Sequence, residues 1–283
     1  MQTPVRIQTK RPRAGLTTLR IVLGTYVVLL LGLVLFEARL VYPGAYMENA
    51  AGLTPLAYSA VQTVRYQGAD QTRLQGRLLE IQDARNVILY LHGNGSQSIW
   101  LDAHLERLSQ RFEATILAAE FRGFDDNDVT PSETTVVADA QAARRYLCRG
   151  YDLDPDQILL YGRSLGGGVA AALAADGGAR AVILDRSFDS LVNVAAEHYP
   201  WAPVRLLMRN RYDSVARLAD YHGPVIQLHG TVDHVVPIAH ARALHRKLGT
   251  LRKRWIEVKG LGHNDWLSDA DLARIVVAVA DFR

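Results

Sequence analysis

Cysteine is scarce in this sequence: Cys148 is the only one in 283 residues, so no disulfide can form within the chain. Acidic residues are missing from the first twenty positions, which hold five lysines and arginines. Without those five charges, the formal net charge of +3 becomes −2 for the remainder. The basic character therefore belongs to the N-terminal tail. The rest of the chain has no excess positive charge with which to bind nucleic acid.

Charge is also missing from positions 21–36, where Thr25 and Tyr26 are the only polar interruptions. A helix of this length spans about 24 Å, and flanking arginines and the apolar positions 40–42 can extend it toward a hydrocarbon core of about 30 Å. The run has no polar face, which disfavours a buried core helix, and no small-residue cleavage site follows, which disfavours a signal peptide. We predict a transmembrane anchor over 21–42.

The domain organisation follows from this anchor. We predict a basic tail over 1–20, a linker rich in proline and glycine over 43–60, and one globular domain over 61–283. Five basic residues precede the anchor and only Arg39 closely follows it. The excess of positive charge predicts a single-pass protein with a cytoplasmic tail and its globular domain on the extracytoplasmic side, in the periplasm or a lumen.

The globular domain begins with partial alternation over 64–81, which suits an antiparallel hairpin. Unbroken apolar runs then recur with helical segments between them, a pattern typical of parallel strands buried on both faces. We predict an α/β fold with a mainly parallel central sheet, helices on both faces and a small cap over 186–223. The runs lie at 87–91, 115–119, 158–161, 181–184, 225–228 and 255–258.

A glycine-x-serine-x-glycine pattern joins one of these strands to an alanine-rich helix. Ser164 lies at its centre, with Gly162 and Gly166 two positions away on either side. Such a turn forces the serine into an unfavourable backbone conformation, and only neighbours without bulky side chains fit around it. The alternative is a glycine-rich turn with an incidental serine, so the interpretation depends on finding a base and an acid.

Ligand chemistry in parallel sheets lies at the carboxyl ends of the strands. Asp233 and His263 follow the last two predicted strands, in the chain order serine, acid, base that this turn requires. A serine hydroxyl needs an imidazole to take its proton and a carboxylate to orient that imidazole. Asp185, at the end of an earlier strand, is an alternative acid. His234 is disfavoured as the base because it adjoins Asp233.

The segment HGNGS at 92–96 follows the first parallel strand. We predict that the backbone N–H groups of Asn94 and Leu165 form an oxyanion hole, although an ordinary strand-to-helix turn would have the same composition. His92 is interpreted as a structural histidine. The acidic cluster at 125–128 lacks the glycine and distal glutamate of a calcium loop, so we interpret it as solvated. No metal or organic cofactor is predicted.

These residues resemble the α/β-hydrolase superfamily over 61–283. More narrowly, the layout is similar to the single-pass, membrane-anchored serine hydrolases of the bud-emergence (Bem) related group. The resemblance implies lysophospholipid or acylglycerol lipases and depalmitoylating thioesterases as relatives, and sequence profiles often group such hydrolases with serine peptidases. The same roles for Ser164, Asp233 and His263 are implied. The matching motifs are LVYP at 40–43, HGNG at 92–95, FRGF at 121–124, GRSLGG at 162–167, YPWAPV at 199–204, RYDS at 211–214 and HGTVDHVVP at 229–237.

We therefore expect a membrane-anchored serine hydrolase that cleaves a carboxylic ester or thioester through an acyl-enzyme, with a small-molecule or lipid acyl substrate. Apolar residues in the cap suit either an acyl pocket or the packing of short helices. Two alternatives remain open. A serine peptidase or amidase shares the machinery, and a non-catalytic binding protein shares the fold, although such proteins usually lose one of the three catalytic residues.

Overall fold

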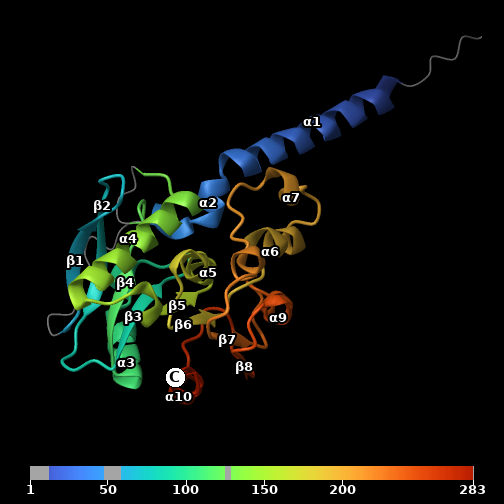
Figure 1. Ribbon diagram of the computed structural model, residues 1–283. Coiled ribbons are helices and arrows are strands. Elements are labelled where there is room, and N and C mark those ends of the chain that lie inside the picture. Colours follow the sequence, from blue (N-terminus) through green and yellow to red (C-terminus); the bar gives the residue numbers. More distant parts are fainter. Residues whose placement is uncertain (1–12, 48–58, 125–128, 283) are drawn as a thin grey trace, which may run out of the picture. The chain divides into compact units, whose positions relative to one another are not determined.

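The computed structural model describes residues 13–47, 59–124 and 129–282, and Figure 1 shows its elements. The chain divides into two compact units, Met1–Glu37 and Ala38–Arg283. Most of the predicted tail, part of the predicted linker and the acidic cluster at 125–128 lie outside the described residues.

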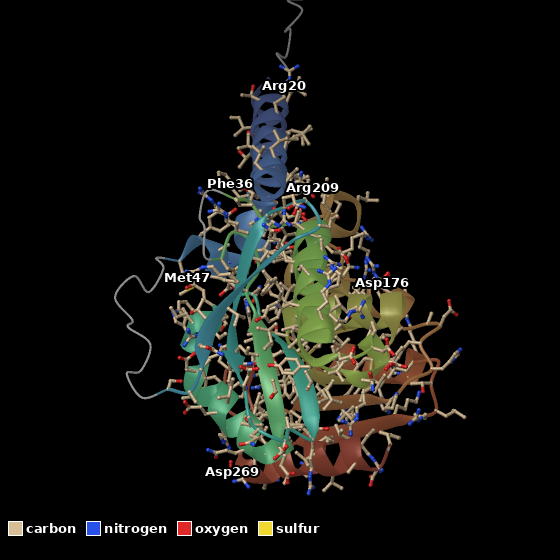
Figure 2. The ribbon with its side chains drawn as sticks, turned by 60° about the vertical axis from the view of Figure 1, so that its left-hand side comes forward. Arg20, Phe36, Met47, Asp176, Arg209 and Asp269 are labelled. Atoms are coloured by element: carbon tan, nitrogen blue, oxygen red, sulfur yellow. The ribbon has the colours of Figure 1, made fainter. Side chains whose placement is uncertain are left out.

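The first unit contains one long helix, α1 (Arg13–Leu35). Its stretch Gly15–Leu35 has 21 residues and reaches a mean hydropathy of 2.2, so by length and composition it can cross a membrane. At the usual rise per residue it is roughly 32 Å long. Side chains project from both sides of the helix between Arg20 and Phe36 (Figure 2). The apolar helix therefore begins earlier in the chain than the predicted anchor.

The second unit takes up residues that were predicted to belong to the anchor and linker. Two short helices, α2 (Glu37–Val41) and η1 (Pro43–Tyr46), stand at the start of the body. Val41 and Tyr42 are buried in its core, and the Tyr42 hydroxyl donates to Oδ1 of Asn210 at 2.8 Å. The Tyr42 ring also meets the edge of Phe124. Protein atoms, rather than lipid, cover this end of the apolar run.

An eight-stranded sheet forms the centre of the body, in the order β1-β2-β4-β3-β5-β6-β7-β8. β2 is antiparallel to both of its neighbours, and all the other pairs are parallel. The predicted fold class is confirmed, including the hairpin at the start. The strands are β1 (Gln62–Gln67), β2 (Arg73–Leu79), β3 (Asn86–Leu91), β4 (Ala114–Ala119), β5 (Leu159–Arg163), β6 (Ala181–Asp185), β7 (Val225–Gly230) and β8 (Lys253–Val258).

Helices cover both faces of this sheet (Figure 1). Successive residues of β3 lie in the two hydrophobic cores on opposite faces of the sheet. Leu89 and Leu91 pack on the side of α4 and α5, and Ile88 and Tyr90 pack on the side of α3 and α10. The remaining helices are η2 (Ser98–Trp100), α3 (Asp102–Phe112), α4 (Glu133–Tyr151), η3 (Pro155–Gln157), α5 (Leu165–Gly177), α6 (Leu191–His198), α7 (Val204–Leu207), α8 (Ser214–Arg217), α9 (Ile238–Lys247) and α10 (Asp269–Ala280).

Parallel strands end at one edge of the sheet, so the loops after β3, β5, β6, β7 and β8 gather there. Gly162 lies near the end of β5, and the other predicted site residues lie in these loops or at the helix start that follows. The segment 186–223, predicted as a cap, contains α6, α7 and α8 between β6 and β7.

Candidate active site

Ser164 joins β5 to α5 in a backbone conformation that side chains rarely adopt, with φ of 53° and ψ of −119°. The glycines around it are required by space. A Cβ atom on Gly162 would lie 2.3 Å from the carbonyl oxygen of Gly166, and one on Gly166 would lie 2.0 Å from that of Leu91. The composition of the turn therefore permits a serine with a strained backbone to stand at the end of a central strand.

His263 brings the three predicted catalytic side chains into one hydrogen-bonded chain. Its Nε2 lies 3.0 Å from the Ser164 hydroxyl oxygen, and its Nδ1 lies 2.7 Å from Oδ2 of Asp233. An ionised carboxylate can only accept, so Nδ1 carries the proton and Nε2 is left to accept from the serine. This is the geometry in which an imidazole can deprotonate a serine.

Asp233 is held as a carboxylate by the groups around it. Burial acts to raise its pKa, but hydrogen bonds from His229 and His263, with the backbone N–H of Val236, outweigh burial and hold that pKa well below its usual range. Oδ1 accepts from the N–H groups of Val235 and Val236 at 3.0 and 2.8 Å. These bonds leave Oδ2 facing His263. A carboxylate so fixed can orient the imidazole and stabilise its cation.

The loop after β3 lies directly against the serine. A Cβ atom on Gly93 would be 3.4 Å from that of Ser164. Asn94 is held at both ends by the start of the body, because its side-chain amide donates to the carbonyl of Val41 and its own carbonyl accepts from the N–H of Gly44, both at 2.9 Å. Within the described part of the chain, the backbone N–H groups of Asn94 and Leu165 donate to no residue.

His92 holds the peptide that contains the Asn94 N–H. Its Nδ1 donates to the carbonyl of Gly93 at 2.8 Å, and its Nε2 lies 2.9 Å from Oε1 of Glu120. A planar trans peptide directs its N–H away from its C=O, so fixing the Gly93 carbonyl also fixes the direction of the Asn94 N–H. The structural role that we predicted for His92 is therefore to hold the Gly93–Asn94 peptide.

Comparison with known proteins identifies the fold. A family model described as the alpha/beta hydrolase fold matches residues 86–220. A crystal structure of an alpha-beta hydrolase from Vibrio vulnificus superposes with a TM-score of 0.68 at 21% identity, covering 87% of this chain and 90% of that one.

The chain has the α/β-hydrolase fold.

Two further proteins are similar to this chain, one in sequence and one in structure. An uncharacterized protein of Mycobacterium tuberculosis (strain CDC 1551 / Oshkosh) is 39% identical over 180 residues, which make up 63% of this chain and 63% of that protein. The chain therefore matches less than two thirds of that relative's length. The esterase domain of a Rhodothermus marinus protein superposes with a TM-score of 0.58 at 19% identity, covering 78% of this chain and 96% of that domain.

Asp185, the alternative acid, forms its hydrogen bonds with residues other than His263. Its carboxylate accepts from the neighbouring Arg186 at 2.7 and 3.1 Å and from the Tyr161 hydroxyl at 3.3 Å. No hydrogen bond between described residues joins it to His263. His234, the disfavoured base, is exposed beside the buried Asp233. Of the two candidate carboxylates, Asp233 is the one in contact with the imidazole.

Sequence reasoning missed three residues that surround the histidine and its acid. Arg163 and Arg186 donate to the main chain of the loop that carries His263. The ring of His229 lies 3.4 Å from Oδ2 of Asp233. Arg163 and Arg186 each adjoin a residue that was singled out, Ser164 and Asp185, but an arginine in a sequence is ordinarily a surface residue. Only their hydrogen bonds in the folded chain reveal their role.

The cap contacts the loop of the acid, since Nε2 of His198 donates to the carbonyl of Val235 at 2.9 Å. Described residues also form a hollow of about 450 Å³ between the cap and α9, lined by five charged or polar side chains and three alanines. There His240 bridges Asp189 and Glu197, and those carboxylates raise the pKa of His240. The acyl pocket in the cap stays a prediction.

The described residues contain no cluster of histidine, cysteine and acidic side chains able to hold a metal ion. The acidic cluster at 125–128, for which we predicted a solvated loop, lies outside the described residues.

Proposed function

We propose that this protein is a serine hydrolase that cleaves carboxylic ester or thioester bonds through an acyl-enzyme. One observation carries the proposal: the Ser164 hydroxyl, His263 and Asp233 form a continuous hydrogen-bonded chain of 3.0 and 2.7 Å beside a strained strand-to-helix turn. The esterase domain from Rhodothermus marinus shows that this fold can carry ester hydrolysis, at 19% identity to this chain.

In the proposed reaction, Ser164 attacks the substrate carbonyl carbon while Nε2 of His263 takes the hydroxyl proton. Asp233 stabilises the resulting imidazolium. The N–H groups of Asn94 and Leu165 donate to the oxyanion of the tetrahedral intermediate. As this intermediate collapses, the bond to the alcohol or thiol breaks and the leaving group receives the proton from His263. Water then attacks the acyl-enzyme by the same steps, releasing the acid and free serine.

We also propose that α1 tethers the enzyme to a membrane, with the tail in the cytoplasm and the body outside it. The support is the 21-residue apolar helix with exposed side chains and the basic charge before it. Tethering to a membrane favours lipid or acylated substrates. A reporter fused after Arg283 should be active only outside the cytoplasm, and a cytoplasmic signal would contradict this orientation.

The hydrolase proposal is tested by assaying the full chain in detergent micelles against p-nitrophenyl esters and acyl thioesters of increasing chain length. We expect turnover by the wild type and a loss of about 10⁴-fold or more in kcat for Ser164→Ala, as removal of a nucleophile should cause. An organophosphonate should label the wild type and leave Ser164→Ala unlabelled.

Two results would contradict the proposal. Equal turnover by both proteins would assign any hydrolysis to another group or to a contaminant. A wild type that neither hydrolyses esters nor reacts with the organophosphonate would favour a binding protein on the hydrolase fold. Labelling without ester turnover would point instead to the peptidase or amidase alternative.

A further inference from the structure

Arg186 is the largest side chain that the fold buries completely, with 1% of its surface exposed. It follows β6 directly, and its backbone has a φ of 51°, in the left-handed region that non-glycine residues seldom occupy. Burying a guanidinium away from water is costly unless charge and hydrogen bonds compensate it. A buried charge on a strained backbone beside the proposed active site therefore requires an explanation.

The neighbouring Asp185 compensates the charge. Its two carboxylate oxygens accept from Nε and Nη2 of Arg186 at 2.7 and 3.1 Å, which is the two-point geometry that arginine favours. Burial acts to raise the pKa of Asp185, but the charge and hydrogen bonds of Arg186 act in the opposite direction and outweigh burial. The pKa of Asp185 therefore lies below its usual value, and the carboxyl group stays ionised. The pair occupies two of the three guanidinium nitrogens and leaves Nη1 to bind elsewhere.

Nη1 of Arg186 binds the main chain of the loop that carries His263. It donates to the carbonyl oxygens of Gly262, His263 and Asp265 at 3.1, 2.9 and 2.6 Å. The His263 carbonyl also accepts from Nη2 of Arg163 at 3.1 Å. This loop lies between β8 and α10 and has no ladder of its own, so its carbonyls need donors from other segments.

The backbone of the same dipeptide reaches the other two parts of the site. The carbonyl of Asp185 accepts from the N–H of Ser164 at 2.9 Å. The N–H of Arg186 donates at 2.8 Å to the carbonyl of Leu228, in β7, the strand that leads to Asp233. One dipeptide therefore contacts the nucleophile, the strand of the acid and the loop of the base.

We infer that Arg186 is a positioning residue for the proposed hydrolysis, which sets the place of the His263 ring by binding the main chain of its loop. The inference rests on the proposed function for its kinetic consequence and on the hydrogen bonds for its structural one. Arg186 touches neither the Ser164 hydroxyl nor the imidazole. It acts by keeping Nε2 of His263 within hydrogen-bond distance of Ser164, and a displacement of about 1 Å at such a contact can cost about 100-fold in rate.

The test is Arg186→Lys, which keeps the positive charge but cannot bind a carboxylate and several carbonyls at once. We expect kcat to fall by roughly 10- to 100-fold with KM changed by less than about threefold, because the substrate still binds while the base is misplaced. Arg163→Gln removes the second donor to the His263 carbonyl. It should lower kcat in the same way but by less. If Arg186→Lys fails to fold, the kcat of Arg163→Gln still tests whether donors to the loop position His263.

The matched control is Arg77→Lys, in a pair of the same design away from the site. Arg77 binds both carboxylate oxygens of Asp102 and donates to the carbonyl of Val61 at 3.0 Å, with 4% of its side chain exposed. It should lower the melting temperature to a similar degree while leaving kcat unchanged. A comparable loss of kcat in this control would mean that any buried arginine matters equally, and would overturn the inference.

A second measurement does not depend on turnover. The proton on Nδ1 of His263 should give a low-field NMR resonance, absent from His263→Ala, because Asp233 accepts it at 2.7 Å. We expect this resonance to broaden or vanish in Arg186→Lys and to persist in Arg77→Lys. Its persistence in Arg186→Lys, with kcat within about threefold of the control, would overturn the inference. If the wild type hydrolyses no ester, the proposed function fails, while the resonance still decides whether Arg186 positions His263.

Discussion

The turn around Ser164 and the loop around His263 place two partners of one hydrogen bond, but they do so by different means. At Ser164 the sequence itself supplies the solution: Gly162 and Gly166, each two positions away, remove the Cβ atoms that would clash. The loop of His263 depends on Arg163 and Arg186, which lie 100 and 77 positions away. Steric requirements of a tight turn are local, whereas carbonyls of an irregular loop take their donors from wherever the fold brings them.

The largest effect on the histidine side is expected from Asp233→Asn. An amide can present an N–H where the carboxylate accepts, which favours the wrong tautomer of His263, and such a change typically lowers kcat by about 10⁴-fold. The turn around Ser164 should be unaffected, so KM should change little. Steady-state kinetics with a p-nitrophenyl ester measure both constants.

The control for this prediction is His234→Ala, an exposed neighbour on the same loop. It should retain the wild-type kcat. A loss of less than tenfold in Asp233→Asn would show that another carboxylate orients the imidazole, and Asp185 would then be the first to substitute.

The turn around Ser164 should be broken by a single methyl group. In Gly166→Ala the new Cβ would lie 2.0 Å from the carbonyl oxygen of Leu91, a backbone atom that cannot move without disturbing β3. We expect a loss of about 3 kcal/mol or more in stability, seen as a lower melting temperature.

Gly150→Ala is the matched control for that methyl group. Gly150 is in α4 and a Cβ there meets nothing within 4 Å. Alanine should stabilise the helix by about 0.5–1 kcal/mol. Equal melting temperatures for the two variants would mean that the turn relaxes easily and that its glycines are not required by space.

The smallest effect concerns pH and the histidine loop. The ring of His104 packs 4.7 Å from that of Trp266, three positions after His263. Burial lowers the pKa of His104 to about 4, with the charge of Arg163 adding to the effect and that of Asp185 opposing it. The folded chain therefore leaves His104 neutral at a pH where the unfolded chain protonates it, so stability falls as pH drops below about 6.5.

Thermal unfolding at pH 7 and pH 4.5 measures this contribution. The wild type should lose on the order of 1–3 kcal/mol more than His104→Phe, which keeps an aromatic ring against Trp266 but has nothing to protonate. Parallel losses in the two proteins would mean that the imidazole is not the group responsible.

Much of the fold was predictable because buried parallel strands have to be apolar throughout. The predicted run at 158–161 corresponds to β5 (Leu159–Arg163), and the other five runs also fall on strands. The boundary at the membrane was less predictable. An apolar run such as 40–42 has the same composition whether lipid or protein covers it, and only the contacts of Tyr42 with Asn210 and Phe124 reveal the latter.

For the candidate site, the chain order of Ser164, Asp233 and His263 was enough to propose one cluster, and the structure brings the three together. Asp233 was the predicted acid, but Asp185 stayed an alternative because it ends a strand at the same edge of the sheet. The contacts decide between them: Asp185 pairs with Arg186, and Asp233 reaches the imidazole.

By itself, the sequence determined what depends on neighbours along the chain: the apolar strands, the helix that can span a membrane and the strained turn at Ser164. Tertiary structure alone decided what depends on distant partners. It buried Tyr42 in the body, paired Asp185 with Arg186 and placed two guanidinium groups on the carbonyl of His263. The physical reason is that side-chain shape and backbone sterics act over a few residues, whereas a buried charge or carbonyl is satisfied by whichever group the packed fold brings within about 3 Å.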